Sequence, residues 1–178
     1  MNYLSDILEI INHKYRFTIK EMQNIKIKWH ASIEEIPKII WNNFLKENST
    51  PFYKWDWLNA LERSKSVSTK YGWQPLFLSA WSENDLIACA PLYLKSHSYG
   101  EFIFDNAFVQ LAQDMGIQYY PKLIGMSPLS PIEGYRFLFA EGVSERELTQ
   151  ILLSEIDSFA KHNNLSLIHI SEPTRPLR

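Results

Sequence analysis

The sequence predicts an α/β fold of the α+β kind, in which helices flank a mixed and largely antiparallel central sheet. The order of elements supports this: a strand, two helices, three strands, a helix, two strands and a final helix. Two apolar segments at residues 75–81 and 86–94 are joined by a short polar turn, which predicts an antiparallel hairpin. An amphipathic helix over residues 144–163 is expected to cover one face of the sheet.

The first secure element is a strand at residues 25–30, where apolar and polar side chains alternate strictly. Ser32 and Glu35 have the spacing of a capping box and predict that a helix follows. Its apolar face is expected to contain Ile36, Ile39, Ile40 and Phe44. Pro37 removes a backbone donor, so the regular helix is expected to begin only at that residue. A second helix is indicated by Trp57, Leu58 and Leu61.

Pro91 interrupts the second strand of the hairpin and predicts a bulge or break there, because proline cannot donate to a sheet ladder. Further strands are predicted at residues 102–104, 122–124 and 135–139. Asp105 or Asn106 can cap a helix with an apolar face, and Gly116 stands where that helix ends. The apolar side chains of this helix are Phe108, Leu111, Ala112 and Met115.

Composition limits the classes of function. The 178 residues are 46% hydrophobic and 14% aromatic, which is enough apolar material for a packed core. A formal charge of −2, without a block of basic residues, argues against non-specific nucleic-acid binding. No apolar run reaches the roughly 20 residues of a membrane span, and the acidic Asp6 and Glu9 argue against a signal peptide, so we expect a cytoplasmic protein. The single Cys89 is expected to be buried and inert.

Three segments are distinguished along the chain. Residues 1–24 form a lead-in segment, and residues 25–164 form the folded lobe. Residues 165–178 do not read as native sequence, because Leu165 to Arg175 back-translate into the end sequence of a transposase adapter used in sequencing libraries. We therefore leave this last segment out of the functional interpretation.

The densest polar cluster is the segment Lys-Ser-His-Ser-Tyr-Gly-Glu at residues 95–101, followed by Asp105. It stands where the long apolar strand ends, and a rigid sheet positions such side chains while leaving them reachable. His97 and Glu101 are the candidate acid or base groups. The structural alternatives are a hydrogen-bonded loop histidine, and capping or an ion pair for Glu101 and Asp105. No His or Cys set has the spacing of metal ligands.

Three segments carry a resemblance to a known family. They are Gly-Trp-Gln-Pro at residues 72–75, Pro-Leu-Tyr-Leu-Lys-Ser-His-Ser-Tyr-Gly-Glu-Phe-Ile-Phe-Asp at 91–105, and Gly-Ile-Gln-Tyr-Tyr-Pro-Lys-Leu at 116–123. The chain resembles the FemAB-like peptidoglycan biosynthesis/recognition family, a branch of the GNAT acyltransferase superfamily, over about residues 27–164. The resemblance implies two GNAT-like lobes in one longer chain, of which this is the truncated N-terminal lobe. The partner it implies is the C-terminal lobe.

The resemblance implies transfer of an acyl or aminoacyl group to an amine acceptor, with a peptidoglycan precursor as a candidate substrate. His97 or Glu101 would be the base, and Tyr99 or Lys95 would donate to the oxyanion. The other expected substrate-binding residues are Ser98, Asp105, Tyr119, Tyr120, Lys122 and Arg136. For the aromatic residues the alternative is a place in the core, and for Arg136 it is a surface ion pair.

The sequence departs from the superfamily in its phosphate-binding motif. The glycines that present backbone N–H groups to the cofactor pyrophosphate are missing from residues 104–107, so we expect this lobe to bind no cofactor. Acyl-CoA or aminoacyl-tRNA would then be a donor for the full-length protein. Two alternatives remain: a non-catalytic module that binds a peptide, a glycan precursor or a protein partner, and a lobe that only supports a catalytic one.

Overall fold

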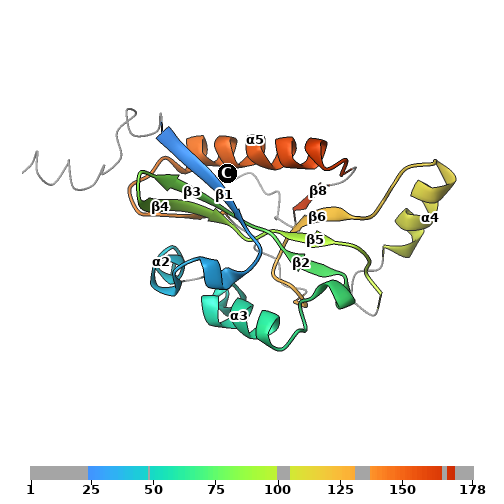
Figure 1. Ribbon diagram of the computed structural model, residues 1–178, viewed down its shortest axis with the longest axis horizontal. Coiled ribbons are helices and arrows are strands. Elements are labelled where there is room, and N and C mark those ends of the chain that lie inside the picture. Colours follow the sequence, from blue (N-terminus) through green and yellow to red (C-terminus); the bar gives the residue numbers. More distant parts are fainter. Residues whose placement is uncertain (1–23, 48, 100–104, 131–136, 166–167, 171–178) are drawn as a thin grey trace, which may run out of the picture.

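The structure is a computed structural model that describes residues 24–47, 49–99, 105–130, 137–165 and 168–170. Its strands are β1 (Ile25–His30), β2 (Trp73–Pro75), β3 (Phe77–Ser82), β4 (Asp85–Ala90), β5 (Tyr93–Lys95), β6 (Lys122–Gly125), β7 (Leu138–Phe139) and β8 (Ile168–Ile170). Its helices are α2 (Lys38–Asn43), α3 (Trp55–Arg63), α4 (Asn106–Asp114) and α5 (Glu145–His162), with 3₁₀ turns η2 (Ile33–Glu35), η3 (Pro51–Tyr53) and η4 (Thr69–Tyr71). The predicted α+β fold class is confirmed (Figure 1).

One long hairpin contributes strands to two sheets. The first sheet has the order β1-β3-β4-β7, and the second has the order β2-β5-β6-β8. All neighbours pair antiparallel except β6 and β8, which are parallel. Between the two sheets the hairpin is held by one bond, from the N–H of Leu76 to the carbonyl of Leu92 at 2.9 Å. The predicted hairpin and the predicted break at Pro91 are confirmed, and the sheet that the sequence predicted is divided in two there.

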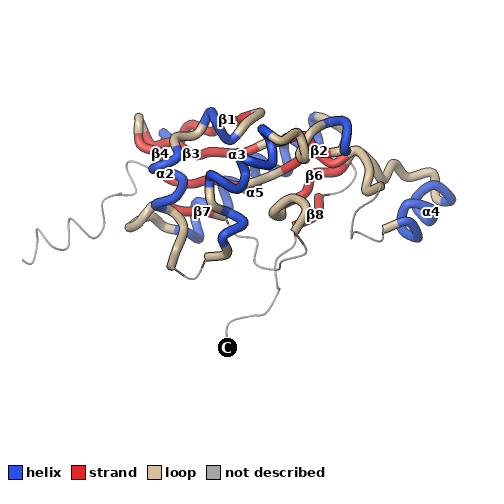
Figure 2. Tube along the Cα trace, turned by 90° about the horizontal axis from the view of Figure 1, so that it is seen from below, coloured by secondary structure: helices blue, strands red, loops and turns tan. Residues whose placement is uncertain are grey.

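Helices pack on both faces of the first sheet. Figure 1 shows α5 along one face and α2 and α3 on the other, and in Figure 2, seen from below, these helices overlap the strands of the sheet. α5 buries Leu148, Leu152 and Ile156 against the sheet, which confirms its predicted position. The opposite core contains Trp41 of α2, Leu58 and Leu61 of α3, and the sheet residues Phe77 and Tyr93.

The predicted apolar face of the first helix is wrong at one residue. Ile39 is 76% exposed, and the buried side chains of this segment are Ile36, Trp41 and Phe44. Pro37 is the cause: α2 begins only after it, at Lys38, so Ile36 belongs to the preceding turn and the two do not share a helical phase.

The predicted capping box of Ser32 and Glu35 forms only in part. Ser32 accepts the N–H of Glu34, while Glu35 accepts the N–H of Ala31 in place of that of Ser32. Ser144 occupies the N-cap position of α5 without a side-chain bond to the helix. The helix starts are therefore predicted correctly, but the reciprocal bonds are not.

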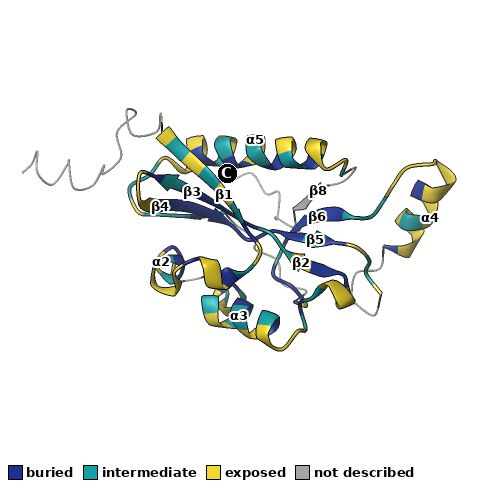
Figure 3. Ribbon diagram, viewed as in Figure 1, coloured by how far each residue is buried: buried dark blue, intermediate teal, exposed yellow. Residues whose placement is uncertain are grey.

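α4 is confirmed as a helix and lies apart from the two cores. Figures 1 and 3 show it projecting beyond the second sheet, with most of its surface exposed. Of the four apolar side chains that the sequence placed on its inner face, Phe108, Leu111 and Met115 are exposed and Ala112 is buried. The predicted strand at residues 102–104 and the start of that at 135–139 lie outside the described residues. No helix in the described ranges is long and apolar enough to cross a membrane.

The packing of α5 predicts that two adjacent leucines differ in their contribution to stability. Leu152 is 0% exposed, whereas Leu153 is 39% exposed. We expect Leu152→Ala to lower the free energy of unfolding by about 2–5 kcal/mol, because it removes buried methyl groups and leaves a cavity. Leu153→Ala is the matched control and should cost well under half as much. Denaturant unfolding of both variants measures the difference, and equal costs would contradict the packing of α5.

Candidate functional site

A row of three side chains crosses the end of the second sheet. Trp73 on β2 is opposite Lys95 on β5, and Lys95 is opposite Lys122 on β6. Directly opposed residues of antiparallel strands lie on the same face, so the three are neighbours. Trp73 and Lys95 are 0% exposed and Lys122 is 2% exposed. The ammonium of Lys95 lies 4.1 Å from the centre of the Trp73 ring. Buried lysines are costly without such compensation, which makes this end of the sheet unusual.

Asp105 is the centre of the polar cluster beside this row. Its Oδ2 accepts the hydroxyl of Tyr120 at 2.5 Å and the ammonium of Lys122 at 2.9 Å. Ser98 lies 3.4 Å from the same oxygen and 2.6 Å from the Tyr120 hydroxyl. Lys122 also donates to the hydroxyl of Tyr119 at 3.2 Å. We call these five residues, Ser98, Asp105, Tyr119, Tyr120 and Lys122, the Asp105 cluster.

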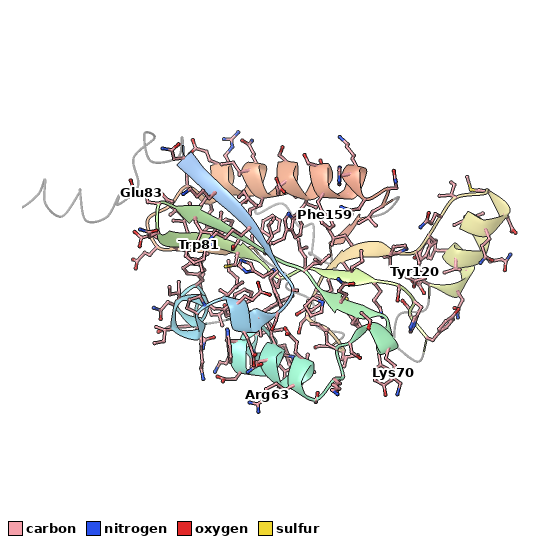
Figure 4. All side chains as sticks on the ribbon, viewed as in Figure 1. Arg63, Lys70, Trp81, Glu83, Tyr120 and Phe159 are labelled. Carbon is pink, nitrogen blue, oxygen red and sulfur yellow. The ribbon has the colours of Figure 1, made fainter. Side chains whose placement is uncertain are left out.

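Three separate segments bring the Asp105 cluster together. Ser98 follows β5, Asp105 precedes α4, and the two tyrosines precede Lys122 at the start of β6. Figure 4 shows Tyr120 beside α4, at the opposite end of the long hairpin from Trp81 and Glu83. The pairing of β5 with β6 is nonlocal in sequence, and it is this pairing that places the Ser98 loop next to Tyr120.

Asp105 does not cap its own helix. It occupies the N-cap position of α4, but its side chain makes no bond to the helix. The carboxylate bonds instead with Tyr120 and Lys122. Of the two structural alternatives for Asp105, capping by the side chain is wrong, whereas the ion pair is present, with Lys122 as the partner. An aspartate at this position ordinarily satisfies a free N–H of the first turn, so its alternative use indicates a stronger set of interactions in the cluster.

The cluster keeps Asp105 ionised at neutral pH. Burial raises the pKa of Asp105, but the hydrogen bonds from Tyr120 and Lys122 and the charge of Lys122 together lower it below its ordinary value of 3.8. Burial and then the bond to the Asp105 carboxylate raise the pKa of Tyr120. Tyr120 thus stays a protonated donor, and Asp105 stays a charged acceptor.

The protonation states of Asp105 and Tyr120 determine which groups of the cluster can still form a hydrogen bond with a ligand. The proton of Tyr120 is directed at Asp105, so in the 2.6 Å contact Ser98 is the donor. Ser98 therefore retains oxygen lone pairs that can accept an N–H. The Tyr119 oxygen accepts from Lys122, and a hydrogen bond from Tyr119 to Asp105 also helps to lower the pKa of that carboxyl. The cluster can thus present an acceptor at Ser98, and Tyr119 can donate to a ligand when its proton turns away from Asp105.

His97 and Tyr99 lie on the same loop as Ser98 but contact other groups. Their rings stack with centroids 4.9 Å apart, and the N–H of Tyr99 approaches Nδ1 of His97 at 3.4 Å. Beneath them is Gly72, at a φ of +75°, where an added Cβ would lie 3.0 Å from two ring atoms of His97. The carbonyl of Gly72 also accepts the N–H of Ser96. Gly72 therefore supports the loop that carries these residues.

The structure brings together five of the predicted site residues and separates the others. Ser98, Asp105, Tyr119, Tyr120 and Lys122 form one cluster, Lys95 lies in the adjacent row with Trp73, and His97 and Tyr99 form a separate stacked pair. Glu101 and Arg136 lie outside the described residues. Sequence reasoning gave no role in the site to Gly72 or Trp73. The signal that could have indicated the role of Gly72 was a glycine in a turn just before an apolar strand. Among the described residues, no group of three or more His, Cys, Asp and Glu side chains could hold a metal ion.

The contact between Gly72 and His97 yields a prediction with an internal control. Gly72→Ala should be more destabilising than Gly116→Ala, because both have positive φ but only at Gly72 would the Cβ meet a neighbour, the His97 carbonyl at 2.8 Å. The backbone term common to both is about 1–2 kcal/mol. Denaturant unfolding gives the two free energies, and the NMR signals of the His97 ring should shift only in Gly72→Ala. Equal losses in the two variants would show that the loop does not rest on Gly72.

The lowered pKa of Asp105 predicts how stability depends on pH. The unfolded chain binds the Asp105 proton at higher pH than the folded chain, so acid favours unfolding. Asp105→Asn should be about 3 kcal/mol less stable than wild type at pH 7, because it leaves Lys122 buried without its counter-charge. This difference should shrink as the pH falls below the ordinary carboxyl value toward the lowered one. Unfolding series from pH 7 to acid, with the exposed Asp114→Asn as control, test this, and a difference that does not depend on pH would contradict it.

Comparison with known proteins places the chain in a family. The model of the FemAB-like family, described as peptidoglycan biosynthesis/recognition, matches residues 32–175. Comparison with curated proteins and with solved structures gives no match. The matched range includes the whole Asp105 cluster and extends into residues 165–175, whose assignment to an adapter stays a prediction. It covers well over half of the 178 residues, and the chain therefore belongs to the FemAB-like peptidoglycan biosynthesis/recognition family.

Proposed function

We propose that this chain is a lobe of an N-acyltransferase that passes an acyl or aminoacyl group to an amine of a peptidoglycan precursor. The observation that carries the proposal is the Asp105 cluster, in which a helix-capping residue is turned to hold Lys122 and Tyr120. Membership in a peptidoglycan biosynthesis/recognition family supports the substrate class.

In the proposed reaction the amine nitrogen attacks the carbonyl carbon of a thioester or ester donor. The new C–N bond forms as the C–S or C–O bond breaks, the amine proton passes to a base, and the leaving thiol or hydroxyl recovers a proton. Ser98 would accept an N–H of the incoming amine, and Tyr119 would donate to the oxyanion that develops on the carbonyl oxygen. Lys122 would polarise Tyr119, and Asp105 would hold Lys122 in place.

The base in this proposal is His97 or Glu101, as the sequence predicted. His97 is the one within the described residues, and its Nδ1 accepts the N–H of Tyr99 only in a long contact of 3.4 Å. Asp105 is not assigned this role, because its lowered pKa makes it a weak proton acceptor. The donor would be an acyl-CoA or an aminoacyl-tRNA, bound in the cytoplasm with the help of a second lobe.

A second candidate function is recognition of the precursor without turnover. It is favoured by the degree to which the Asp105 cluster is satisfied internally, since the carboxylate and the Lys122 ammonium are already paired with each other. Such a cluster can orient a ligand through Ser98 and Tyr119 without moving a proton. The two functions share a ligand and differ in whether a covalent product forms.

The test is a transfer assay on the complete chain, with an amine-bearing muropeptide as acceptor and acyl-CoA or aminoacyl-tRNA as donor, and with mass spectrometry of the product. Removing the proposed oxyanion donor in Tyr119→Phe should lower the rate by about 10²–10³, and His97→Ala should lower it by about 10²–10⁴. Tyr71→Phe is the matched control, because Tyr71 is exposed and lies outside the cluster. Muropeptide affinity, measured by calorimetry, should change much less than the rate.

Two outcomes would count against transfer. If the muropeptide binds and neither donor yields product, the recognition function replaces the transfer function. If Tyr119→Phe transfers at the wild-type rate, the assignment of Tyr119 as oxyanion donor fails.

A further inference from the structure

The stacked pair of His97 and Tyr99 forms a flat aromatic surface that the proposed reaction does not use. Tyr99 is 81% exposed, although its ring lies within 4.9 Å of the His97 ring and nearly parallel to it, at 24°. The inner face of Tyr99 is covered by His97, and the outer part of the ring is open to solvent. We call this pair the aromatic ledge.

The aromatic ledge is supported from below. His97 packs over Gly72, where the positive φ and the absence of a Cβ allow the ring to approach the backbone. The N–H of Ser96 bonds to the carbonyl of Gly72 at 3.0 Å, which ties the loop to the same turn. The layers are therefore glycine, histidine, tyrosine and solvent. A ring held in this way loses little conformational entropy when a ligand packs against it, and such preorganisation favours binding.

The aromatic ledge and the Asp105 cluster are neighbours on one short loop. Ser98 stands between His97 and Tyr99 in sequence and bonds to Tyr120, while the two rings on either side of it stack on each other. A ligand lying on the ledge therefore has the hydroxyl of the half-buried Ser98 beside it, whereas the carboxylate of Asp105 is buried. The nearby ammonium of Lys122 is already bound to Asp105.

We propose that the aromatic ledge binds a pyranose ring, with the C–H face of the sugar on Tyr99 and its hydroxyl edge toward Ser98. An exposed tyrosine ring offers an apolar face that is bordered by a polar tip, which matches a ring whose face is apolar and whose edge carries hydroxyl groups. A nucleotide fits less well, because the cation of the cluster is engaged and a phosphate needs a basic partner.

This inference rests on the proposed function, because it assigns the sugar of the precursor to the aromatic ledge and its peptide amine to the Asp105 cluster. The loop that carries Ser98 would then contact both halves of the ligand. Ser98, which belongs to the Asp105 cluster, stands between His97 and Tyr99 of the aromatic ledge in the chain, so one residue joins the two sites.

The test measures binding in the absence of any donor, so it holds or fails independently of transfer. The complete chain is titrated with the peptidoglycan disaccharide and, separately, with the free stem peptide, and affinities are measured by calorimetry and NMR. We expect the disaccharide to shift the signals of Tyr99 and His97. Tyr99→Ala and Tyr99→Leu should weaken disaccharide binding roughly tenfold, whereas Tyr99→Phe, which keeps the ring face, should bind as wild type does. Tyr71→Ala is the control for loss of an exposed tyrosine.

The inference is overturned if the disaccharide does not bind while the stem peptide does, or if Tyr99→Leu binds the disaccharide as well as wild type does. It is also overturned if Tyr71→Ala weakens binding as much as Tyr99→Ala. Thermal melts of each variant show that the fold is intact, which the exposure of both tyrosines leads us to expect. Disaccharide binding that depends on the Tyr99 ring, together with no transfer in the separate assay, would support the ledge and remove the proposed reaction.

Discussion

Pro75 and Pro91 both lack an amide hydrogen, and both lie where the long hairpin passes from one sheet to the other. Each proline lacks a donor, so the ladder loses a hydrogen bond at each position: Pro75 ends β2 opposite Tyr93, and Pro91 lies in the break between β4 and β5. The hairpin is held there by the bond from Leu76 to Leu92, and the two halves recruit different partners. β1 and β7 join the half that contains β3 and β4, whereas β6 and β8 join the half that contains β2 and β5.

The position of the candidate site follows from this division. The second sheet carries Lys95 and Lys122 away from α5 and the α2–α3 layer, to the end of the molecule beside α4 (Figures 1 and 4). Two buried ammonium groups on adjacent strands are unfavourable unless each has a partner. Asp105 supplies the partner of Lys122, and in doing so it joins the start of α4 to β6. One ion pair therefore connects the helix, the Ser98 loop and the second sheet.

Local sequence patterns correctly predicted those strands and helices in which one regularly spaced face is buried. The alternation at β1 and the apolar spacing of α5 identified both correctly, because in each case one face packs on the sheet. Ile39 was misplaced because Pro37 resets the helical phase, a local event that periodicity averages over. The apolar side chains of α4 carry a regular helical pattern, yet Phe108 is 63% exposed. Periodicity reveals which residues share a face, but not what that face contacts.

The candidate site shows the same limit. The sequence predicted the residues of the Asp105 cluster as site residues, among them Ser98, Asp105, Tyr120 and Lys122. Their connection depends on the pairing of β5 with β6, two strands that the whole of α4 separates in the chain. Asp105 was interpreted as a cap because its position before a helix has that local explanation. The support from Gly72 was not predicted, because it depends on a loop 24 residues further along the chain resting on that glycine.

The loop after β5 carries two kinds of side chain, and this explains why one segment can serve two kinds of chemistry. Lys95 points to the buried face, and beyond it His97 and Tyr99 stack together while Ser98 points to the Asp105 cluster. The rings can then be open to solvent while the hydroxyl next to them is held by a buried carboxylate. The two rings and the Ser98 hydroxyl are attached to the same short stretch of backbone, so a ligand that contacts the rings lies next to Ser98. The support that Gly72 gives to His97 therefore also holds Ser98 in place.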